Sequence, residues 1–271
     1  MKILSASEIK DEQYKKVLTE LLYQLADDDF IIAFRGSEWL GLAPHIEEDV
    51  AFSSINQDTM GHAAMFYQLL EELGEGEVDQ LAHGRKSSER RNAIILEEVN
   101  GPGDYLSEPE YDWAFAVVRN YFYAQAKKGR MDSLKQSSYQ PLADVAVKAN
   151  MELYYHLLHW KTWFTQLVNA GGEARMRMEK AVEKVAKDFA GVVTLGELGA
   201  EMVSHQLIES EELLLKRWKN AVEPIFQATN LPLPDLEMSR GDGRTGVHTK
   251  DLDKAIETLS EVYNTDPLAS W

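Results

Sequence analysis

Apolar residues recur at helical spacing along most of the chain, and this periodicity is the strongest signal in the sequence. It predicts a first amphipathic helix over residues 8–26. The apolar stripe of that helix consists of Val17, Leu18, Leu21, Leu22 and Leu25. The acidic run Asp27-Asp28-Asp29 is typical of a helix N-terminus, where carboxylates favour the positive end of the helix dipole. We therefore expect a second helix from about residue 28 to Leu42, ended by the break at Gly41–Pro44.

The same periodicity predicts several further helices. They cover about Glu47–Leu73, 87–98, 110–128, Gln140–Asn169, 173–190, 200–228 and 249–264. Glycines follow the predicted helices 47–73 and 140–169, and Ser107-x-x-Glu110 resembles a capping box before the helix that ends at Lys128. No strand pattern or short repeat is visible, and residues 230–248 read as a loop rich in Pro and Gly.

These elements predict an all-α fold in a single domain, residues 1–271. Two long hairpins, at about 28–73 and 108–170, would pair as the core of a four-helix bundle. The C-terminal helices and tail, 173–271, would flank that core. In such a bundle, inward-facing positions at matching heights on the four helices can bring side chains together.

Composition narrows the class of protein. The chain has 271 residues, of which 44% are hydrophobic, and this is enough to bury a sizeable core. It has no cysteine, so neither disulfides nor thiolate ligands are available. A net charge of −17 disfavours binding to nucleic acid or to an anionic membrane. Because neither a secretory signal nor an apolar run of about 20 residues is visible, we expect a soluble cytoplasmic protein.

Two helical segments each place a histidine where a di-metal bundle protein holds a ligand. They are Asp58-Thr59-Met60-Gly61-His62 and Glu152-Leu153-Tyr154-Tyr155-His156. Ferritin-like di-metal proteins supply a Glu-x-x-His pair from each of two helices and one carboxylate from each of two others. Here the residues three before the histidines are Thr59 and Leu153, neither of which is a carboxylate.

Carboxylates do occur four residues before each histidine. Asp58 precedes His62 at this spacing, and Glu152 precedes His156, so that each pair shares one helical face. Glu38 is a candidate third carboxylate. A shifted metal site is therefore physically possible.

Two observations argue against a working metal site. Arg119 lies on the helix that should supply the fourth carboxylate, and a guanidinium repels a metal ion. It would instead neutralise Glu152 or Glu38. If the first hairpin turns near residues 42–46, Glu38 and His62 differ in height by about 18 Å at ~1.5 Å per residue. We therefore expect a degenerate site, with no metal, no other cofactor and no catalytic residue in this chain.

Two other functions remain open from the residues alone. A self-sufficient di-metal oxygenase would use a shifted ligand set made of Asp58, His62, Glu152, His156 and Glu38. A free-standing helical binding protein would instead hold an apolar ligand in a dry pocket between the long helices. The aromatic residues of 113–123 and 154–164 would line that pocket.

Several short motifs, in their order along the chain, resemble one family of proteins. They are Ser37-Glu38-Trp39-Leu40-Gly41-Leu42-Ala43-Pro44, Gln57-Asp58-x-x-Gly61-His62-Ala63, Lys148-x-x-x-Glu152-x-x-Tyr155-His156, and Gly243-Arg244-x-Gly246-x-His248-Thr249 followed by Asp266-Pro267-x-Ala269-x-Trp271. The resemblance spans about Asp27 to Trp271. It is to the bacterial phenylacetate catabolic proteins, and most of all to the C subunits of multicomponent 1,2-phenylacetyl-CoA epoxidases.

The resemblance implies a ferritin-like helical fold and a division of labour in a monooxygenase complex. In that family the A subunit holds the di-iron site and binds the CoA thioester, and a flavin and iron–sulfur reductase subunit supplies electrons. The C subunit resembles the A subunit in fold but lacks a complete ligand set. The resemblance therefore implies that this chain is a structural subunit, which pairs with the A subunit and could form a homodimer in isolation.

The resemblance also assigns positions. The glutamates of the two Glu-x-x-His motifs fall at Thr59 and Leu153, and the acidic ligand of the third helix falls at about Arg119. The residues that match ligand positions are Glu38, His62 and His156.

Overall fold

The computed structural model describes residues 2–104 and 106–269, and Trp271, which ends the last motif, lies outside them. Across these residues the protein is all-α, as predicted, with two isolated β-bridges and no strand. The long helices are α1 (Glu12–Ser37), α2 (Ile46–Glu72), α4 (Trp113–Leu134), α5 (Gln140–Asn169), α6 (Gly172–Val193) and α8 (Glu211–Ala228). The short ones are α3 (Ile94–Glu97), α7 (Gly199–Ser204) and α9 (Lys250–Ser260). None of the described helices is long and apolar enough to cross a membrane.

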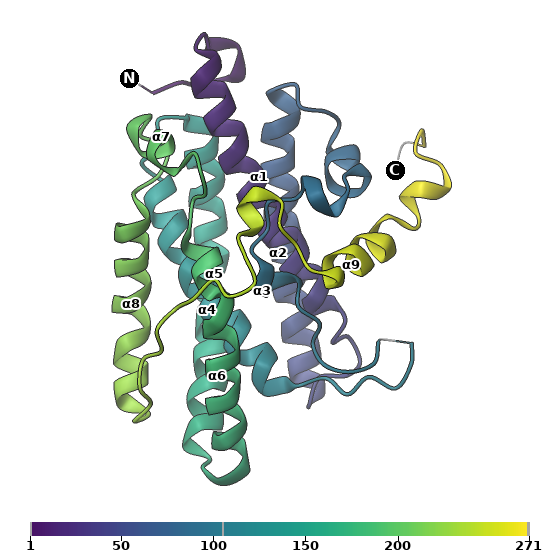
Figure 1. The fold of residues 1–271 in the computed structure, drawn as a ribbon, viewed down its shortest axis with the longest axis vertical. Helices are drawn as coiled ribbons and strands as arrows, with labels where there is room; N and C mark the ends of the chain where they lie inside the picture. The colour runs from purple at the N-terminus through teal and green to yellow at the C-terminus, as the bar shows by residue number, and fades with distance from the viewer. Residues whose placement is uncertain (1, 105, 270–271) are drawn as a thin grey trace.

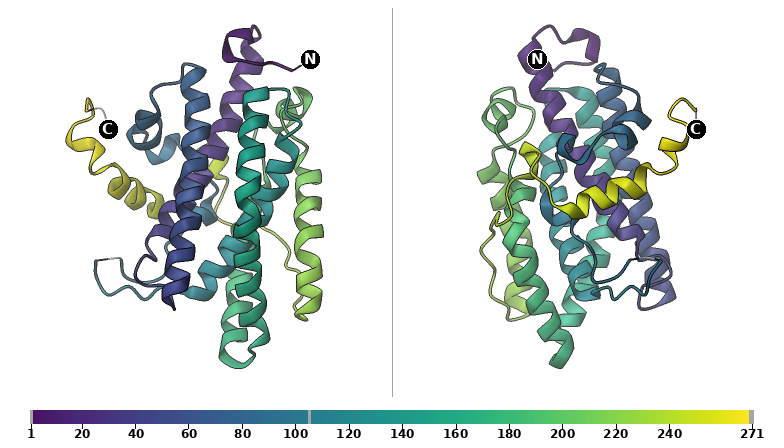
Figure 2. Two further views of the ribbon diagram at one scale, coloured as in Figure 1. Left: turned by 180° about the vertical axis from the view of Figure 1, so that it is seen from behind. Right: turned by 45° about the vertical axis from the view of Figure 1, so that its right-hand side comes forward.

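The long helices form two antiparallel hairpins that pack against each other. α1 and α2 make the first hairpin, α4 and α5 make the second, and α6 and α8 pack against α4. Figure 1 shows α8 along one edge and α6 nearer the middle, while α9 and the segment after it project from the opposite edge. Seen from behind, α2 and α5 run side by side (Figure 2, left). The arrangement is consistent with the ferritin-like bundle that the resemblance implies.

α1 runs without a break through the acidic run, so the predicted division into two helices was wrong. Asp27, Asp28 and Asp29 lie in the interior of α1 and are at most 1% exposed. Successive residues of an α-helix point about 100° apart. The three carboxylates therefore face three different parts of the protein, and each is compensated there by its own cations.

Asp27 faces the segment that links α2 to α3. Its carboxylate accepts hydrogen bonds from the Tyr67 hydroxyl at 2.6 Å and from Arg85 Nη1 at 3.1 Å, and Arg90 Nη1 lies 3.4 Å away. Burial by itself would raise the pKa of Asp27, but the two guanidinium groups outweigh it and hold that pKa at about 2. Asp27 is therefore a permanent anion that fixes this linker on α1.

Asp28 points in a second direction and contacts three segments. Arg244, in the loop before α9, donates from both terminal nitrogens to the two oxygens of Asp28, each at 2.8 Å. Arg130 of α4 donates at 2.9 Å, and the backbone N–H of Ala93 donates at 2.8 Å. Bidentate guanidinium–carboxylate pairs of this kind are among the stronger hydrogen-bonded contacts in proteins. The Gly243-Arg244 motif thus ties the C-terminal part of the chain to α1.

Three other predicted boundaries also differ from the structure. Within the predicted helix over 87–98 only a 3-10 turn, Ser87–Glu89, and the short α3 form, because two backbone N–H groups between them bond to the carboxylates on α1 instead. The capping box at Ser107 does not form, and Asp112 caps α4 in its place. The helix predicted over 200–228 is interrupted between α7 and α8, where Ser210 caps the second helix.

We predict that Arg244→Met lowers the free energy of unfolding by about 3–5 kcal/mol, because it leaves a buried carboxylate without its bidentate partner. Arg177→Met is the matched control, since Arg177 forms an exposed pair with Glu173 on α6. That change should cost less than about 1 kcal/mol. Urea unfolding followed by circular dichroism measures both values, and equally small effects would contradict the role given to Arg244.

Candidate metal centre

The two predicted histidines meet between α2 and α5. Their ring centroids lie 6.4 Å apart, and both side chains are buried. Each bonds to a carboxylate of the opposite helix: His62 Nε2 lies 2.5 Å from Glu152 Oε2, and His156 Nε2 lies 2.9 Å from Asp58 Oδ2. The carboxylates that share a face with one histidine are therefore paired with the other, across two antiparallel helices.

A lysine from a third helix completes this cluster. Lys127 of α4 places Nζ 2.7 Å from His62 Nδ1 and 2.8 Å from Asp29 Oδ1 on α1. The hydroxyl of Tyr123 donates to the same oxygen of Asp29 at 2.6 Å. All four helices of the two hairpins thus contribute to one buried polar cluster, and its central cation is an ammonium group.

The hydrogen bonds of His62 determine the tautomer and the protonation state of its ring. Lys127 donates to Nδ1, so Nε2 carries the ring proton and donates it to Glu152. Burial, together with the positive charge of Lys127, lowers the pKa of His62 to about 2, which keeps the ring neutral. Burial also lowers the pKa of His156, although its bond to Asp58 acts in the opposite direction.

Burial acts on the two ion-paired groups in opposite senses. It lowers the pKa of Lys127 and raises the pKa of Asp29, while the attraction between them opposes both changes. Both side chains are at most 4% exposed, so that neither has water as an alternative partner. Removing one of the two would leave the other buried without its counter-charge.

The donor set does not fit a di-iron centre. Leu153 is a buried apolar residue, and the Thr59 hydroxyl donates to the backbone carbonyl of Ile55, so neither supplies a bridging carboxylate. The Nδ1 lone pair of His62 is already used by Lys127, and an ammonium has no lone pair to offer a metal. Within residues 2–104 and 106–269, no three His, Asp or Glu side chains form a group that could hold a metal ion.

Glu38 and Arg119 belong to a second polar cluster and not to this one. Glu38 pairs with Arg35 at 2.9 Å and accepts from Asn100 Nδ2 at 2.8 Å. Arg119 donates to Asn100 Oδ1 at 2.6 Å and to the carbonyl of Glu98 at 2.5 Å. Of the two partners expected for Arg119, Glu38 belongs to the same cluster and is joined to it through Asn100, whereas Glu152 pairs with His62, so the expectation was wrong for Glu152 alone.

The positions that the resemblance gave to the first and third helices are also displaced. Asp29 takes the place expected for Glu38, nine residues earlier, and Lys127 takes that expected for Arg119, eight residues later. Eight or nine residues correspond to about 12–13 Å along a helix. The height difference calculated for Glu38 and His62 was a sign of this displacement.

The sequence held a signal for both missed residues. Apolar residues continue at helical spacing on either side of Asp29, which is unusual for a helix start and typical of a helix interior. Tyr123 and Lys127 stand four apart on one face of a helix that is otherwise rich in buried residues. Only the three-dimensional register of the hairpins, however, brings these two faces together.

Little space remains beside the cluster. A cavity of about 20 Å³ lies among the four helices, lined by Thr59, Asn120, Lys127, Leu153 and His156 among others. This volume suits about one water molecule, whereas a cavity that holds benzene measures on the order of 150 Å³. An aromatic ring therefore does not fit between these helices.

Comparison with known proteins agrees with the resemblance predicted from the motifs. The family model described as phenylacetic acid catabolic protein matches residues 1–271. The chain belongs to this family. It is also similar to the C subunit of the 1,2-phenylacetyl-CoA epoxidase of Escherichia coli (strain K12), with 26% identity over 255 residues, which cover 94% of this chain and 99% of that protein.

Membership of this family does not by itself determine which residues of a given chain bind a metal or react. In this chain, the contacts of Asp29, Lys127 and His62 are those of a compensated ion pair with a neutral histidine beside it. Such an arrangement holds four helices in register. Two consequences can be measured.

We predict that Lys127→Met lowers the free energy of unfolding by about 3–5 kcal/mol, because Asp29 then stays buried without a cation. Asp29→Asn in the same chain should restore a large part of this loss, since the amide oxygen can still accept from Tyr123. A double-mutant cycle by urea unfolding measures the coupling. Strictly additive losses would contradict a direct pair between Lys127 and Asp29.

We also predict a pH dependence that belongs to His62. Because folding lowers the pKa of His62 to about 2, the unfolded chain binds a proton below about pH 6.5 that the folded chain does not. The free energy of unfolding should therefore fall as the pH falls through 6.5, by up to about 1.4 kcal/mol per pH unit for this group. His62→Gln should remove this part of the slope between pH 7.5 and pH 5. Identical slopes would show that His62 can be protonated in the fold.

Proposed function

We propose that the chain is a non-catalytic structural subunit of a 1,2-phenylacetyl-CoA epoxidase in bacterial phenylacetate degradation, and that it acts in the cytoplasm. Its task would be to brace a related catalytic A subunit, which would carry the di-iron centre. The single observation that carries the proposal is Lys127, whose ammonium lies against His62 Nδ1 where a metal ion would need that lone pair. The name of the Escherichia coli relative supports the assignment to this kind of complex.

The two other functions considered from the sequence have less support. A self-sufficient oxygenase would need Glu38 beside the histidines, and Glu38 pairs with Arg35 in the second cluster instead. A binding protein for an apolar ligand would need a large dry pocket between the long helices. The space beside the cluster measures about 20 Å³ and has Lys127 and Asn120 in its wall.

The intact fold around this cluster has a physical rationale. Ion pairs and hydrogen bonds that are fully compensated fix the heights of four helices without requiring a metal. A bundle of fixed geometry presents rigid outer faces. Rigid faces suit a permanent interface between subunits, because little conformational entropy is lost when they bind. The chain would thus keep the shape of an oxygenase subunit while leaving the chemistry to its partner.

The test combines metal content with reconstitution. Protein purified without chelators should contain well below one iron per chain, whereas the catalytic A subunit, loaded in the same way, is the positive control. Near-stoichiometric iron that is lost in His62→Ala would overturn the proposal.

Reconstitution with the catalytic and reductase subunits separates a structural role from a catalytic one. Leaving this chain out should abolish or strongly reduce epoxidation, while His62→Gln should leave turnover within about threefold of the wild type. Removing a catalytic acid or base typically costs about 10²–10⁴-fold. A loss of that size in a folded His62→Gln complex would contradict the proposal, and so would full activity without the chain.

A further inference from the structure

An apolar stripe lies on the outer face of α5. Between residues 147 and 158, the exposed positions are Val147, Lys148, Met151, Tyr154, Tyr155 and Leu158. All but Lys148 are apolar or aromatic, and Tyr154 and Tyr155 are 64% and 71% exposed. Their spacing places the five on one side of the helix, away from the buried side that carries His156. α5 therefore packs one side into the bundle and exposes a second apolar surface on its other side.

The neighbouring helix continues this surface. On α2, every exposed position from residue 50 to residue 68 is uncharged: Val50, Ser54, Gln57, Gly61 and Gln68. The hydrogen bonds of His62 to Glu152 and of Asp58 to His156 hold α2 directly beside α5. Figure 2 (left) shows the two helices side by side on the side seen from behind. We call these exposed residues of α2 and α5 together the α2–α5 face.

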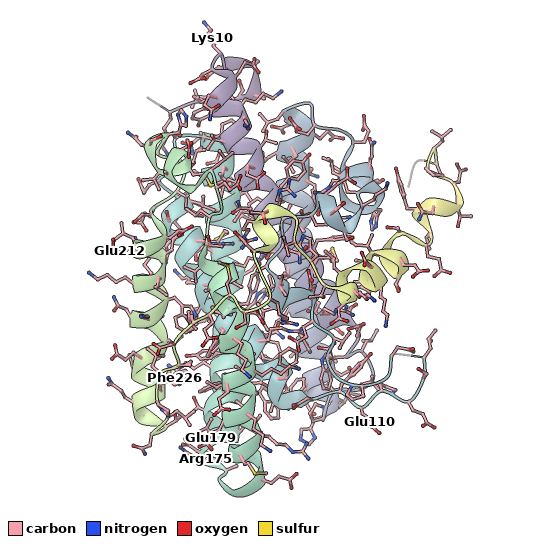
Figure 3. All side chains as sticks on the ribbon, in the orientation of Figure 1. Lys10, Glu110, Arg175, Glu179, Glu212 and Phe226 are labelled. Carbon is pink, nitrogen blue, oxygen red and sulfur yellow. The ribbon has the colours of Figure 1, made fainter. Side chains whose placement is uncertain are left out.

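The exposed side of α6 differs from the α2–α5 face. On α6, every exposed position from 177 to 187 is charged: Arg177, Glu179, Lys180, Glu183, Lys184 and Lys187. Figure 3 shows Arg175 and Glu179 on α6 and Glu212 on α8 among the many charged side chains of that side. In a chain with 27% charged residues, the stretches 50–68 and 147–158 are a local exception, because Lys148 is the one charged residue among their exposed positions. Contiguous apolar patches of this kind mark interaction sites.

Gly61 gives an independent indication that something approaches α2 closely. A glycine inside a helix costs about 1 kcal/mol relative to alanine, so a structural reason is expected. The described residues of this chain supply none, since among them a Cβ atom at Gly61 would meet no atom within 4 Å and its backbone angles are ordinary. A glycine at an open position on a helix surface lets the backbone or a side chain of another molecule pack directly against the helix.

We propose that the α2–α5 face is the surface on which a helical partner subunit docks, and that this partner presents an apolar stripe edged by lysine and arginine. The inference rests on the proposed function, because that function requires a partner subunit. It adds to that function the surface at which the partner binds and the kinds of side chain that the partner presents there. Packing of two helices against two others would bury both apolar stripes, with Tyr154 and Tyr155 as the anchoring side chains.

Charge favours a different protein over a second copy of this chain. The two helices carry two basic residues, Lys148 and Lys161, against eight acidic ones: Glu47, Glu48, Asp49, Asp58, Glu71, Glu72, Asp144 and Glu152. A symmetric dimer through this face would bring these acidic edges towards each other, and like charges in contact are unfavourable. A partner with basic edges would compensate them, including the half-exposed carboxylates of Asp58 and Glu152.

The size of the face suits a stable contact. From residue 50 to residue 68, α2 is about 27 Å long, and two adjacent helices are about 20 Å wide. The product is about 540 Å², which is close to the lower end of the roughly 600–1,000 Å² that each protein contributes to a specific interface.

The experiment measures the affinity of the full-length chain for the catalytic A subunit by isothermal titration calorimetry. Gly61→Arg and Leu158→Arg should each weaken binding by about 30-fold or more, as expected at the centre of an interface. Leu213→Arg is the matched control, because Leu213 is a similarly exposed leucine on α8, at 47% against 54% for Leu158. It should bind like the wild type. Thermal unfolding of Gly61→Arg should be unchanged or slightly higher, since arginine is the better helix former.

The outcomes separate this inference from the function on which it rests. If the wild type binds the A subunit and the Gly61 and Leu158 variants bind equally well, the surface is wrong and the proposed function stands. If the wild-type chain does not bind the A subunit at all, the proposed function and the inference both fail. If instead the isolated chain is a dimer that Gly61→Arg converts to a monomer, a second copy occupies the face and the commitment to a basic partner is overturned.

Discussion

Three consecutive carboxylates inside one helix are the constraint on which the rest of the structure depends. Asp27, Asp28 and Asp29 lie in the interior of α1, where an uncompensated charge would cost several kcal/mol. Each therefore requires cations from other segments, and the helical twist sends the three requirements in three directions. The linker after α2, the loop before α9 and the helix α4 all take their places relative to α1 in order to meet them.

The third of these requirements also explains the polar centre of the bundle. An ammonium from Lys127 neutralises Asp29 and occupies the lone pair of His62, so one side chain performs the charge compensation that a metal ion performs in a di-iron protein. Two of its three N–H groups are used in these contacts, and the four helices that supply the cluster are held at fixed heights relative to one another.

Local patterns predicted much of the fold, because the spacing of residues within a single helix determines which of them share a face. The all-α class and the two histidine segments follow from spacings of three and four residues. The acidic run was misread, since carboxylates at a helix start and carboxylates paired in a helix interior look alike until their partners are known. Those partners lie far along the chain: Arg85, Lys127 and Arg244 are separated by between 58 and 216 residues from the aspartates that they contact. That Asp29 and Lys127, and not Glu38 and Arg119, join the histidine cluster depends on the register between the two hairpins. No single helix encodes that register.

The bond between Asp28 and Arg244 also sets the order in which the chain can become stable during its synthesis. Arg244 follows Asp28 by 216 residues, and Asp28 belongs to the first long helix. While a ribosome is still making the middle of the protein, Asp28 can already be enclosed by α4 but lacks the bidentate partner that compensates it. Domains generally complete folding as units, and here the unit is incomplete until the loop before α9 has emerged. A product of premature termination would therefore retain a buried, under-compensated carboxylate, which would make it a ready substrate for proteolysis.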